Sequence, residues 1–366
     1  MECPSQFLSE DDIHVIRSNS PVAESRGRLT AAQLRLIHER RWFTIMVPEY
    51  ADGLELPLPT VMRLLEAAAW ADGSFGWVLN LVAGANMFAG FLPEEPAKKI
   101  FGSPQTCVAG SGALSGNAEK VDGGYRISGS WKYASGASHA DFFSVSCLLT
   151  LNGQPITDPD GHQKTRSFLI PEHQVTLSDQ WNSYGLKATA SYDFIIQDVF
   201  VPDAHSFFLA APSPFASGAL YRFPFLQLAE ALLAITMSGM ARHFIDLITE
   251  LSKNKILADL RRKKDYPAME GTIDRAKTTL DEGRINLYGS VQSVWAMYEK
   301  REPVANAELH TLSGHAKQCA FLSRTVTENL YPWAGMDAVV PEGDINRVWR
   351  DVHTASQHIL LSPFTP

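Results

Sequence analysis

The stretch "EKVDGGYRISGSWKY" (119–133) places an Asp-Gly-Gly turn between two runs in which polar and apolar residues alternate. Alternation indicates half-buried strands, and a short turn with Asp-Gly is a strong signal for a β-hairpin. The preceding "GSGALSG" (110–116) looks like a dinucleotide-binding fingerprint, but its spacing is GxGxxxG. A Rossmann turn must also lead directly into a helix that holds the pyrophosphate. Because a hairpin follows instead, the sequence argues against a Rossmann domain.

The β character extends from about residue 104 to residue 208. Further candidate strands are "DFFSVSCLLTL", "RSFLIP" and "YDFIIQDVFVP". Five or more short strands without intervening helices predict a small barrel or sandwich. In that setting "GSGALSG" is either a loop between strands or a run of small residues that lets the backbone approach a flat ligand from the side.

Helical patterns lie on both sides of this β segment. "LTAAQLRLIHERRW" (29–42) begins with Thr30 as a predicted N-cap, and an apolar helical region follows it. Beyond residue 226 the helical patterns are long and their connections short, which predicts a four-helix bundle. We therefore expect a mainly α fold with a central β domain: an N-terminal helical domain (1–103), a β-barrel domain (104–208), a linker (209–225) and a C-terminal four-helix bundle (226–366).

The composition narrows the classes of function. The net charge of −8 on 366 residues is modest, and we expect no nucleic-acid partner. We find no apolar run of the roughly 18 residues that a membrane span needs and no signal peptide. The four cysteines have no CxxC or other metal-ligand spacing, so we expect reduced thiols, no metal site and a cytoplasmic location.

Four stretches together resemble the acyl-CoA dehydrogenase superfamily, and most of all its branch of two-component flavin monooxygenases. They are "WFTIMVPEYADGLELPLPTVMRLLEAAAWADGSFGW" (42–77), "VDGGYRISGSWKYASGASHADFF" (121–143), "WNSYGLKATASYDFIIQDVFVP" (181–202) and "INRVWRDVHTASQHILLSP" (345–363). The resemblance implies an acyl-CoA dehydrogenase-like fold, a homotetramer and a flavin between barrel and bundle. It also implies that a separate flavin reductase supplies reduced flavin, which hydroxylates a small aromatic or heteroaromatic substrate with O2.

The resemblance assigns a flavin site to residues of the β segment. Trp131 would give a flat apolar wall, and Ser135, four residues on, a hydroxyl for the flavin N5. Taken alone, these two residues read as a core tryptophan and a turn serine. Trp181 and Ser191 carry over as a second wall and a second hydroxyl. Backbone contacts to the flavin ring are expected from two residues of the glycine-containing stretch, Ser111 and Ala113.

The closing segment "INRVWRDVHTASQH" (345–358) reads as a helix with distinct faces. Arg347, Asp351, Thr354 and His358 fall on one line beside the apolar stripe. This line is either an Arg347–Asp351 pair with a half-buried histidine or a polar seam at the edge of a cavity. The opposite line is expected to face solvent, and it consists of Arg350, His353 and Gln357.

The resemblance gives His358 a catalytic role. The dehydrogenases carry a glutamate within one residue of this position, whereas "HTASQHILLS" has no carboxylate. A neutral imidazole can take the proton of a phenol-like hydroxyl, which suits hydroxylation. Monooxygenases of this branch often have a second histidine near the position that Asn86 occupies in this sequence. An asparagine there can orient a proton but cannot accept one as a base.

Two alternatives stay open at this point. An acyl-CoA dehydrogenase with tightly bound FAD would use Glu230, which lies near the position of an alternative catalytic glutamate. A non-catalytic flavin-fold binding protein is the other. "YPWAGMDAVVP" (331–341) keeps one glycine of the dehydrogenases' adenine-binding turn, and Lys253 stands near the place of an arginine donated by a neighbouring subunit. This loss favours reduced FMN over FAD, and the sequence does not identify the substrate.

Overall fold

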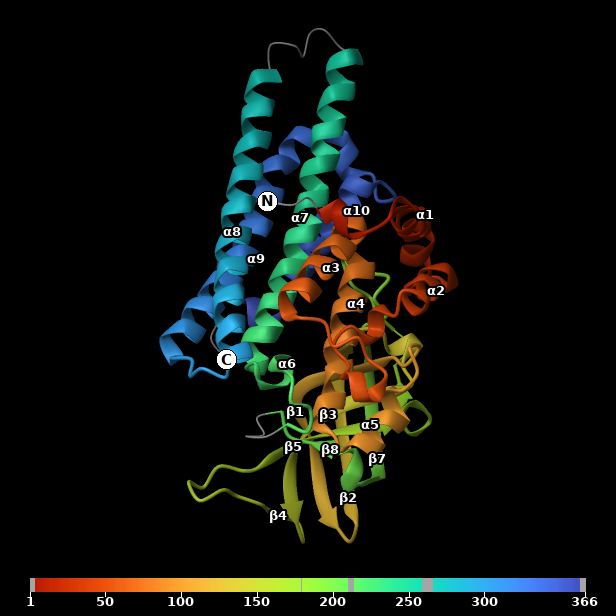
Figure 1. The fold of residues 1–366 in the computed structure, drawn as a ribbon. Coiled ribbons are helices and arrows are strands. Elements are labelled where there is room, and N and C mark those ends of the chain that lie inside the picture. Colours follow the sequence, from red (N-terminus) through yellow and green to blue (C-terminus); the bar gives the residue numbers. More distant parts are fainter. Residues whose placement is uncertain (1–3, 179, 210–213, 259–265, 363–366) are drawn as a thin grey trace.

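The computed structural model describes residues 4–178, 180–209, 214–258 and 266–362 (Figure 1). The N-terminal helices are α1 (Glu10–Arg26), α2 (Ala31–Glu39), α3 (Leu58–Ala71), α4 (Gly73–Asn86) and α5 (Glu94–Phe101). Thr30 caps α2 as predicted: its hydroxyl accepts from Gln33 N, and the Gln33 side chain accepts from Thr30 N. The short 3₁₀ turns are η1 (Pro4–Phe7), η2 (Trp42–Thr44), η3 (Glu49–Ala51), η4 (Met87–Phe91), η5 (Ala137–His139), η6 (Glu172–Gln174), η7 (Asp203–His205), η9 (Gly335–Val339) and η10 (Ile359–Leu361).

Helices α3 and α4 form the buried centre of the N-terminal part. Asp72 separates them with an extended backbone, and its side chain accepts from Phe75 N at 2.9 Å as the N-cap of α4. A Cβ at Gly239 of the C-terminal helix α7 (Phe225–Ala258) would lie 2.2 Å from Glu66 O. Only glycine therefore allows α7 to approach α3 this closely.

Two helical segments correct our expectation about membrane-spanning length. Gly73–Phe91 and Phe225–Asn254 are long and apolar enough by length and composition to cross a bilayer. In each segment 83% of the most apolar window is buried inside the fold. Burial of that extent is typical of the core helices of a globular protein.

The central sheet follows the predicted β segment. Its strands are β1 (Val108–Val121), β2 (Gly124–Ala134), β3 (Phe142–Leu151), β4 (Gln154–Pro155), β5 (Thr165–Pro171), β6 (Thr176–Leu177), β7 (Tyr192–Pro202) and β8 (Ser206–Phe207). Within the described residues they form one eight-stranded sheet in the order β6-β7-β2-β1-β3-β5-β8, with β4 beside β3. Strands β6 and β8 at its two ends are not hydrogen-bonded to each other. The sheet is therefore open, and the closed barrel that we expected is wrong in this respect.

The hairpin that decided the fold is present in the predicted place. Val121 pairs with Gly124 across the turn, and Gly123 has a φ of +71°, a conformation that glycine adopts without strain. A hairpin, and not a helix, thus follows "GSGALSG", as predicted. That stretch lies inside β1 and pairs with β3, with register shifts between Ser111 and Leu114 and between Leu114 and Gly116. It is an irregular strand, so the expectation of a loop is wrong.

The C-terminal helices are α6 (Ala219–Arg222), α7, α8 (Tyr266–Lys300), α9 (Asn306–Ala334) and α10 (Asp344–Ala355). Helix α7 packs against α3, α8 and α9, and the shorter α10 packs on α7 and α9 (Figure 1). A buried ion pair fastens this group to the N-terminal helices. Arg284 of α8 donates from Nε and Nη2 to the Glu66 carboxylate of α3 at 2.6 and 3.0 Å. The observed class is mainly helical with a central sheet, as predicted.

Candidate functional site

Three buried hydroxyls from two separate segments form a hydroxyl cluster, which consists of Ser135, Thr189 and Ser191. Ser135 Oγ lies 2.8 Å from Ser191 Oγ, and Ser191 Oγ lies 2.7 Å from Thr189 Oγ1. Ser135 follows β2, whereas Thr189 and Ser191 belong to the turn that leads into β7. The structure thus brings together the two serines that the resemblance assigned to the flavin, 56 positions apart in sequence.

The fixed donors and acceptors at the two ends determine the direction of these hydrogen bonds. Thr189 Oγ1 donates to the Leu186 carbonyl at 2.8 Å, so it can only accept from Ser191. Ser191 then uses its proton on Thr189 and accepts from Ser135. Trp77 Nε1, which is only a donor, donates to Ser135 Oγ at 3.2 Å. In this arrangement the Ser135 hydroxyl donates its hydrogen bond to Ser191, and its oxygen keeps a lone pair that can accept a hydrogen bond from a ligand.

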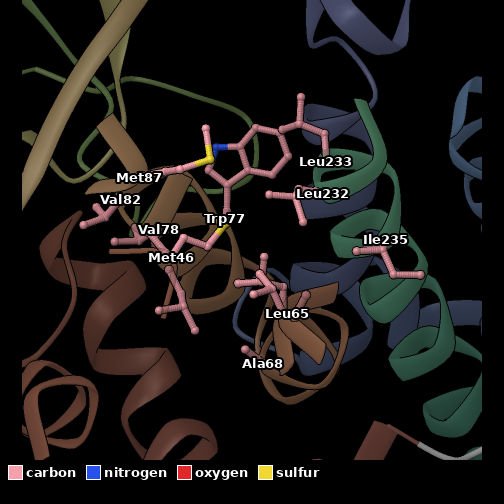
Figure 2. Packing of buried hydrophobic residues seen from close by; sticks show 14 of the residues in the cluster. Met46, Leu65, Ala68, Trp77, Val78, Val82, Met87, Leu232, Leu233 and Ile235 are labelled. Carbon is pink, nitrogen blue, oxygen red and sulfur yellow. The ribbon is translucent and has the colours of Figure 1, made fainter. Parts of the chain in front are cut away.

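Trp77 joins this cluster to His358. It lies on α4 and is buried, and Figure 2 shows it extending towards Leu232 and Leu233 of α7. The ring of His358 meets the Trp77 ring at an interplanar angle of 61°, with the ring centroids 6.0 Å apart. Two residues predicted for the site from distant parts of the chain, Ser135 and His358, therefore contact the same indole.

His358 lies just beyond the closing helix, which ends at Ala355. Its Nδ1 accepts from Leu360 N at 3.3 Å and caps η10. This hydrogen bond assigns the ring proton to Nε2 in the neutral form. Burial lowers the pKa of His358 to about 4, so the imidazole is neutral at pH 7 and presents an N–H donor.

The charged residues of α10 pair differently from the predicted Arg347–Asp351 pair, whereas His358 is half-buried as that interpretation expected. Arg347 pairs with Asp344 at 2.5 Å and Asp72 at 3.6 Å, and the Arg347–Asp351 pair is not formed. Arg350 is buried and pairs with Glu24 of α1 at 2.6 Å, so the expectation that it faces solvent is wrong. α1 covers this side of α10, which the isolated helix could not reveal.

The two other residues expected on the solvent side of this helix are His353 and Gln357. His353 is half-buried against Trp349, with ring centroids 4.2 Å apart, so the prediction of a solvent-facing side chain is wrong for it as well. Gln357 is exposed, as predicted.

The predicted walls and backbone contacts lie on the sheet at different depths. Trp131 is fully buried, stacks on Phe194 at 5.4 Å and donates from Nε1 to Ala113 O. It occupies the inside of the sheet, where the core-tryptophan interpretation had placed it. Trp181 is half-buried and meets the exposed ring of Tyr133 edge to face at 6.0 Å. Ser111 and Ala113 lie at the irregular part of β1 with Ala113 exposed.

Asn86, Glu230 and Lys253 lie outside the hydroxyl cluster. The Asn86 amide donates to Phe43 O and Thr106 O and accepts from Val108 N. Its hydrogen-bonding groups are therefore occupied by the backbone. Glu230 is buried on α7, with Lys317 of α9 3.7 Å from Oε1. Its Oε2 has no hydrogen-bond partner among the described residues. Lys253 is exposed near the far end of α7, about 30 Å of helix from Leu233 at 1.5 Å per residue.

Sequence reasoning missed two residues that complete the site, Trp77 and Thr189. Trp77 ends the 42–77 stretch that carries the resemblance, but it was given no role in the site. Thr189, in "GLKATAS", was given no role either. A signal for Thr189 was its i,i+2 spacing from Ser191, which puts two hydroxyls on one side of an extended segment. Trp77 offered no comparable signal, because its role depends on how α4 meets the sheet.

A cavity of about 370 Å³ is lined in part by sequence neighbours of the cluster: Ala137 lies two residues after Ser135, and Tyr192 follows Ser191. The full lining consists of Arg28, Ala137, Ser138, His139, Ala140, Glu172, Leu177 and Tyr192. A larger cavity, of about 540 Å³, lies at α2 away from these residues. Among the described residues no group of three or more His, Cys, Asp or Glu could hold a metal ion.

The donor set fits a flavin. The isoalloxazine ring is flat and apolar with a polar N5 edge, and it needs an apolar surface next to a hydrogen-bonding group. Tyr133 exposes 64% of its surface beside the half-buried Trp181, and the buried hydroxyl cluster adjoins this strand end. Ser135, Ser191 and Trp181 are the residues that would hold the group.

Comparison with known proteins finds relatives that match most of this chain. Residues 231–363 match the family model of the acyl-CoA dehydrogenase C-terminal domain. An indole-3-acetate monooxygenase of Pseudomonas putida is 26% identical over 325 residues, which cover 88% of this chain and 81% of that protein. The oxygenase subunit HsaA of a Mycobacterium tuberculosis flavin-dependent monooxygenase is 25% identical, covering 95% and 89%. The oxygenase component of an FADH2-dependent resorcinol hydroxylase of Rhizobium is 24% identical, covering 95% and 88%.

Solved structures show the same fold. 3-HSA hydroxylase from Rhodococcus superposes with a TM-score of 0.89 at 23% identity, covering 98% of this chain and 93% of that one. XiaF from Streptomyces, in complex with FADH2 and glycerol, superposes with a TM-score of 0.84 at 21% identity, covering 98% and 92%. The predicted resemblance to the acyl-CoA dehydrogenase superfamily and its two-component flavin monooxygenase branch is confirmed.

Proposed function

We propose that this chain is the oxygenase component of a two-component flavin-dependent monooxygenase of the acyl-CoA dehydrogenase superfamily, and that it hydroxylates a small aromatic or heteroaromatic compound. One observation carries the proposal: Ser135 and His358 meet at Trp77 as a neutral, hydrogen-bonding site. Reduced flavin, when bound, supplies the electrons for the reaction with O2. The chain's own residues bind and orient the reactants and place protons.

Ser135 and His358 would play complementary roles. Ser135 donates its hydrogen bond to Ser191 and presents a lone pair that would accept a hydrogen bond from the N5–H of a reduced flavin. His358 presents Nε2–H, which would donate a hydrogen bond to an oxygen atom of the reactants. Ser135 is buried and His358 is half-buried, and the exclusion of water strengthens the hydrogen bonds that they form.

Dehydrogenation of an acyl-CoA has less support. That reaction needs a carboxylate base at the flavin, and Glu230 would have to supply it. The Glu230 carboxylate faces Lys317 of α9 instead of the hydroxyl cluster. A binding protein without activity has less support, because the relatives compared above are named as monooxygenases and hydroxylases.

The finer parts of the proposal concern the cofactor, the assembly and the location. Reduced FMN is favoured because "YPWAGMDAVVP" keeps one glycine of the adenine-binding turn, although the resorcinol hydroxylase relative is FADH2-dependent. A homotetramer would bring Lys253 of one protomer towards the flavin of another. A separate reductase would supply the flavin by diffusion, in the cytoplasm.

Anaerobic titration tests the proposal. The purified protein is titrated with photoreduced FMN and, separately, photoreduced FAD, and then mixed with oxygenated buffer containing phenol, indole or resorcinol as probes. The proposal predicts binding of at least one reduced flavin and a hydroxylated product from at least one probe. Protein that retains oxidised FAD through purification and reduces an artificial electron acceptor with an acyl-CoA would favour the dehydrogenase. Binding of neither reduced nor oxidised flavin would overturn both.

A further inference from the structure

Helix α10 is locked to the turn that carries Thr189 and Ser191. Asp351 Oδ1 accepts a hydrogen bond from Leu186 N at 2.6 Å. One residue earlier, a Cβ at Gly185 would lie 2.2 Å from Arg350 O, so glycine allows the two backbones to touch. Leu186 itself has a φ of +51°, an uncommon conformation for a branched side chain, and the contact with α10 holds it there.

The same carboxyl group also touches the start of α4. A Cβ at Gly73, the first residue of that helix, would lie 2.7 Å from Asp351 Oδ2. Trp77 stands four residues further on, one helical turn away and on the same side of the helix. Asp351 is 1% exposed, and its Oδ2 has no hydrogen-bond partner among the described residues.

These two contacts lead to the hydroxyl cluster from opposite sides. From Leu186, the carbonyl accepts from Thr189 Oγ1, and the chain of hydroxyls continues to Ser135. From Gly73, α4 leads to Trp77, whose indole donates to Ser135. We propose that Asp351 is a positioning residue that fixes the 185–191 turn and the start of α4 on α10 and thereby sets the arrangement of the hydroxyl cluster against Trp77.

Charged groups from three elements act on this carboxyl: Asp72 before α4, Glu24 on α1 and Arg347 on α10 itself. Burial, followed by the nearby Asp72, raises the pKa of Asp351 to about 8. The group is therefore largely protonated at pH 7, and its bond to Leu186 N needs an acceptor oxygen but no charge.

This leads to a clean pair of variants. Asp351→Asn keeps an acceptor oxygen of the same shape, whereas Asp351→Ala leaves Leu186 N–H buried without an acceptor. Amide hydrogen exchange of the flavin-free protein at pH 7, followed by mass spectrometry, reads out the contact with Leu186 and its effect on the residues of the hydroxyl cluster. Asp274→Ala, an exposed aspartate on α8, is the matched control.

We expect Asp351→Ala to speed exchange in peptides covering 181–191 and 133–140 by about three- to tenfold, the equivalent of one hydrogen bond. Exchange in the 119–133 hairpin should stay unchanged, and Asp351→Asn should match the wild type. Uniformly faster exchange throughout the chain, or equal loss in the Asn and Ala variants, would overturn the proposal and leave Asp351 with a general packing role.

A second variant keeps the test valid if Asp351→Ala does not fold. Gly73→Ala inserts a methyl group against Asp351 Oδ2 and should loosen the same 181–191 peptide, while Gly84→Ala, on the same helix with open space around it, should not. Equal exchange in these two variants would contradict the proposal. Only the catalytic consequence of this positioning rests on the proposed function. The exchange measurement tests the positioning itself, whether or not the protein hydroxylates a substrate.

The catalytic consequence is measured separately with reduced FMN and reduced FAD in turn. Asp351→Ala should weaken binding of the reduced flavin about tenfold, and Asp351→Asn should restore it. Changed exchange with unchanged affinity for a flavin that does bind would overturn the link to the cluster, whereas no flavin binding by the wild type would count against the proposed function alone.

Discussion

The indole of Trp77 donates a hydrogen bond to Ser135 across 3.2 Å, and this contact joins the N-terminal helices to the end of strand β2. A tryptophan N–H can only donate, so it fixes the orientation of the hydroxyl that it meets. The direction of every hydrogen bond in the hydroxyl cluster follows from the Trp77 N–H at one end and the Leu186 carbonyl at the other.

Ser135→Ala should make the reduced flavin–protein complex react differently with oxygen while leaving the fold intact. Loss of one hydrogen bond at N5 should cost roughly 0.5–1.5 kcal/mol, so reoxidation of the bound flavin in the absence of substrate should be about three- to tenfold faster. Stopped-flow absorbance measures that rate, and circular dichroism checks the fold. An unchanged rate would place Ser135 away from the flavin.

Thr189→Val should change which redox state of the flavin binds better. The variant removes the acceptor for Ser191, and Ser135 no longer has to donate inwards. Ser135 can then offer its proton to the bare N5 of oxidised flavin. We expect the ratio of dissociation constants, oxidised over reduced, to fall about three- to tenfold. Titrations with both forms of FMN measure it, with Thr311→Val at an exposed position of α9 as the control.

The parts of the site that could be predicted from sequence are those fixed by local geometry. The hairpin at Asp122 and Gly123 follows from turn chemistry, and it correctly excluded a Rossmann site before any tertiary contact was known. Ser135, Ser191 and His358 came from the family resemblance, and the structure brings all three to the surroundings of Trp77.

The parts that failed depend on which element covers which face. Helical periodicity placed Arg350 on the solvent side of the closing helix, but α1 packs there and Glu24 pairs with it. The i,i+4 spacing suggested an Arg347–Asp351 pair, whereas Arg347 pairs with Asp344 and with Asp72 of the α3–α4 junction, and Asp351 accepts from the backbone of Leu186. Asp72 and Leu186 lie more than 150 residues from these partners in sequence, beyond the reach of periodicity.

Two half-buried histidines, His139 and His358, should make the stability of the protein sensitive to acid. Burial lowers the pKa of His139 and of His358 to about 4, below the unfolded value of about 6.5. Between those values the unfolded chain holds more protons on these two histidines than the folded chain does, so their contribution to the unfolding free energy is retained above pH 6.5 and falls as the pH drops towards 4. Asp351, whose pKa is raised, acts in the opposite direction, and the comparison with a variant that lacks the two histidines separates the effects. Urea unfolding at pH 7, 6 and 5 measures the slope. The double variant His139→Gln/His358→Gln should flatten it, and a slope as steep as the wild type would contradict the assignment.

Arg347→Ala should destabilise the fold more than a typical surface substitution. It leaves Asp72 buried without its counter-charge and close to Asp351. Removing one partner of a buried pair costs about 3–5 kcal/mol, and guanidinium unfolding measures it. Arg324→Ala, which breaks an exposed pair with Glu328, should cost no more than about 1 kcal/mol. Similar losses in the two variants would mean that the Arg347 site is effectively solvated.

His358→Ala should reduce hydroxylation of an accepted probe substrate by about 10²-fold, because it removes a positioned proton-transfer or hydrogen-bonding group from the site. The alanine variant also loses the cap of η10, so His358→Asn is the sharper test: its side-chain oxygen can replace Nδ1 as the acceptor for Leu360 N. We expect Asn to restore thermal stability but not turnover.

His353→Ala is the control on the same segment. It loses the contact with Trp349 and should lower stability, since His353 is half-buried, while turnover per folded protein should stay within about twofold of the wild type. If His353→Ala lowers turnover more than His358→Asn does, then the group that acts on the reactants lies on the Trp349 side of α10, and the contact between His358 and Trp77 is only packing.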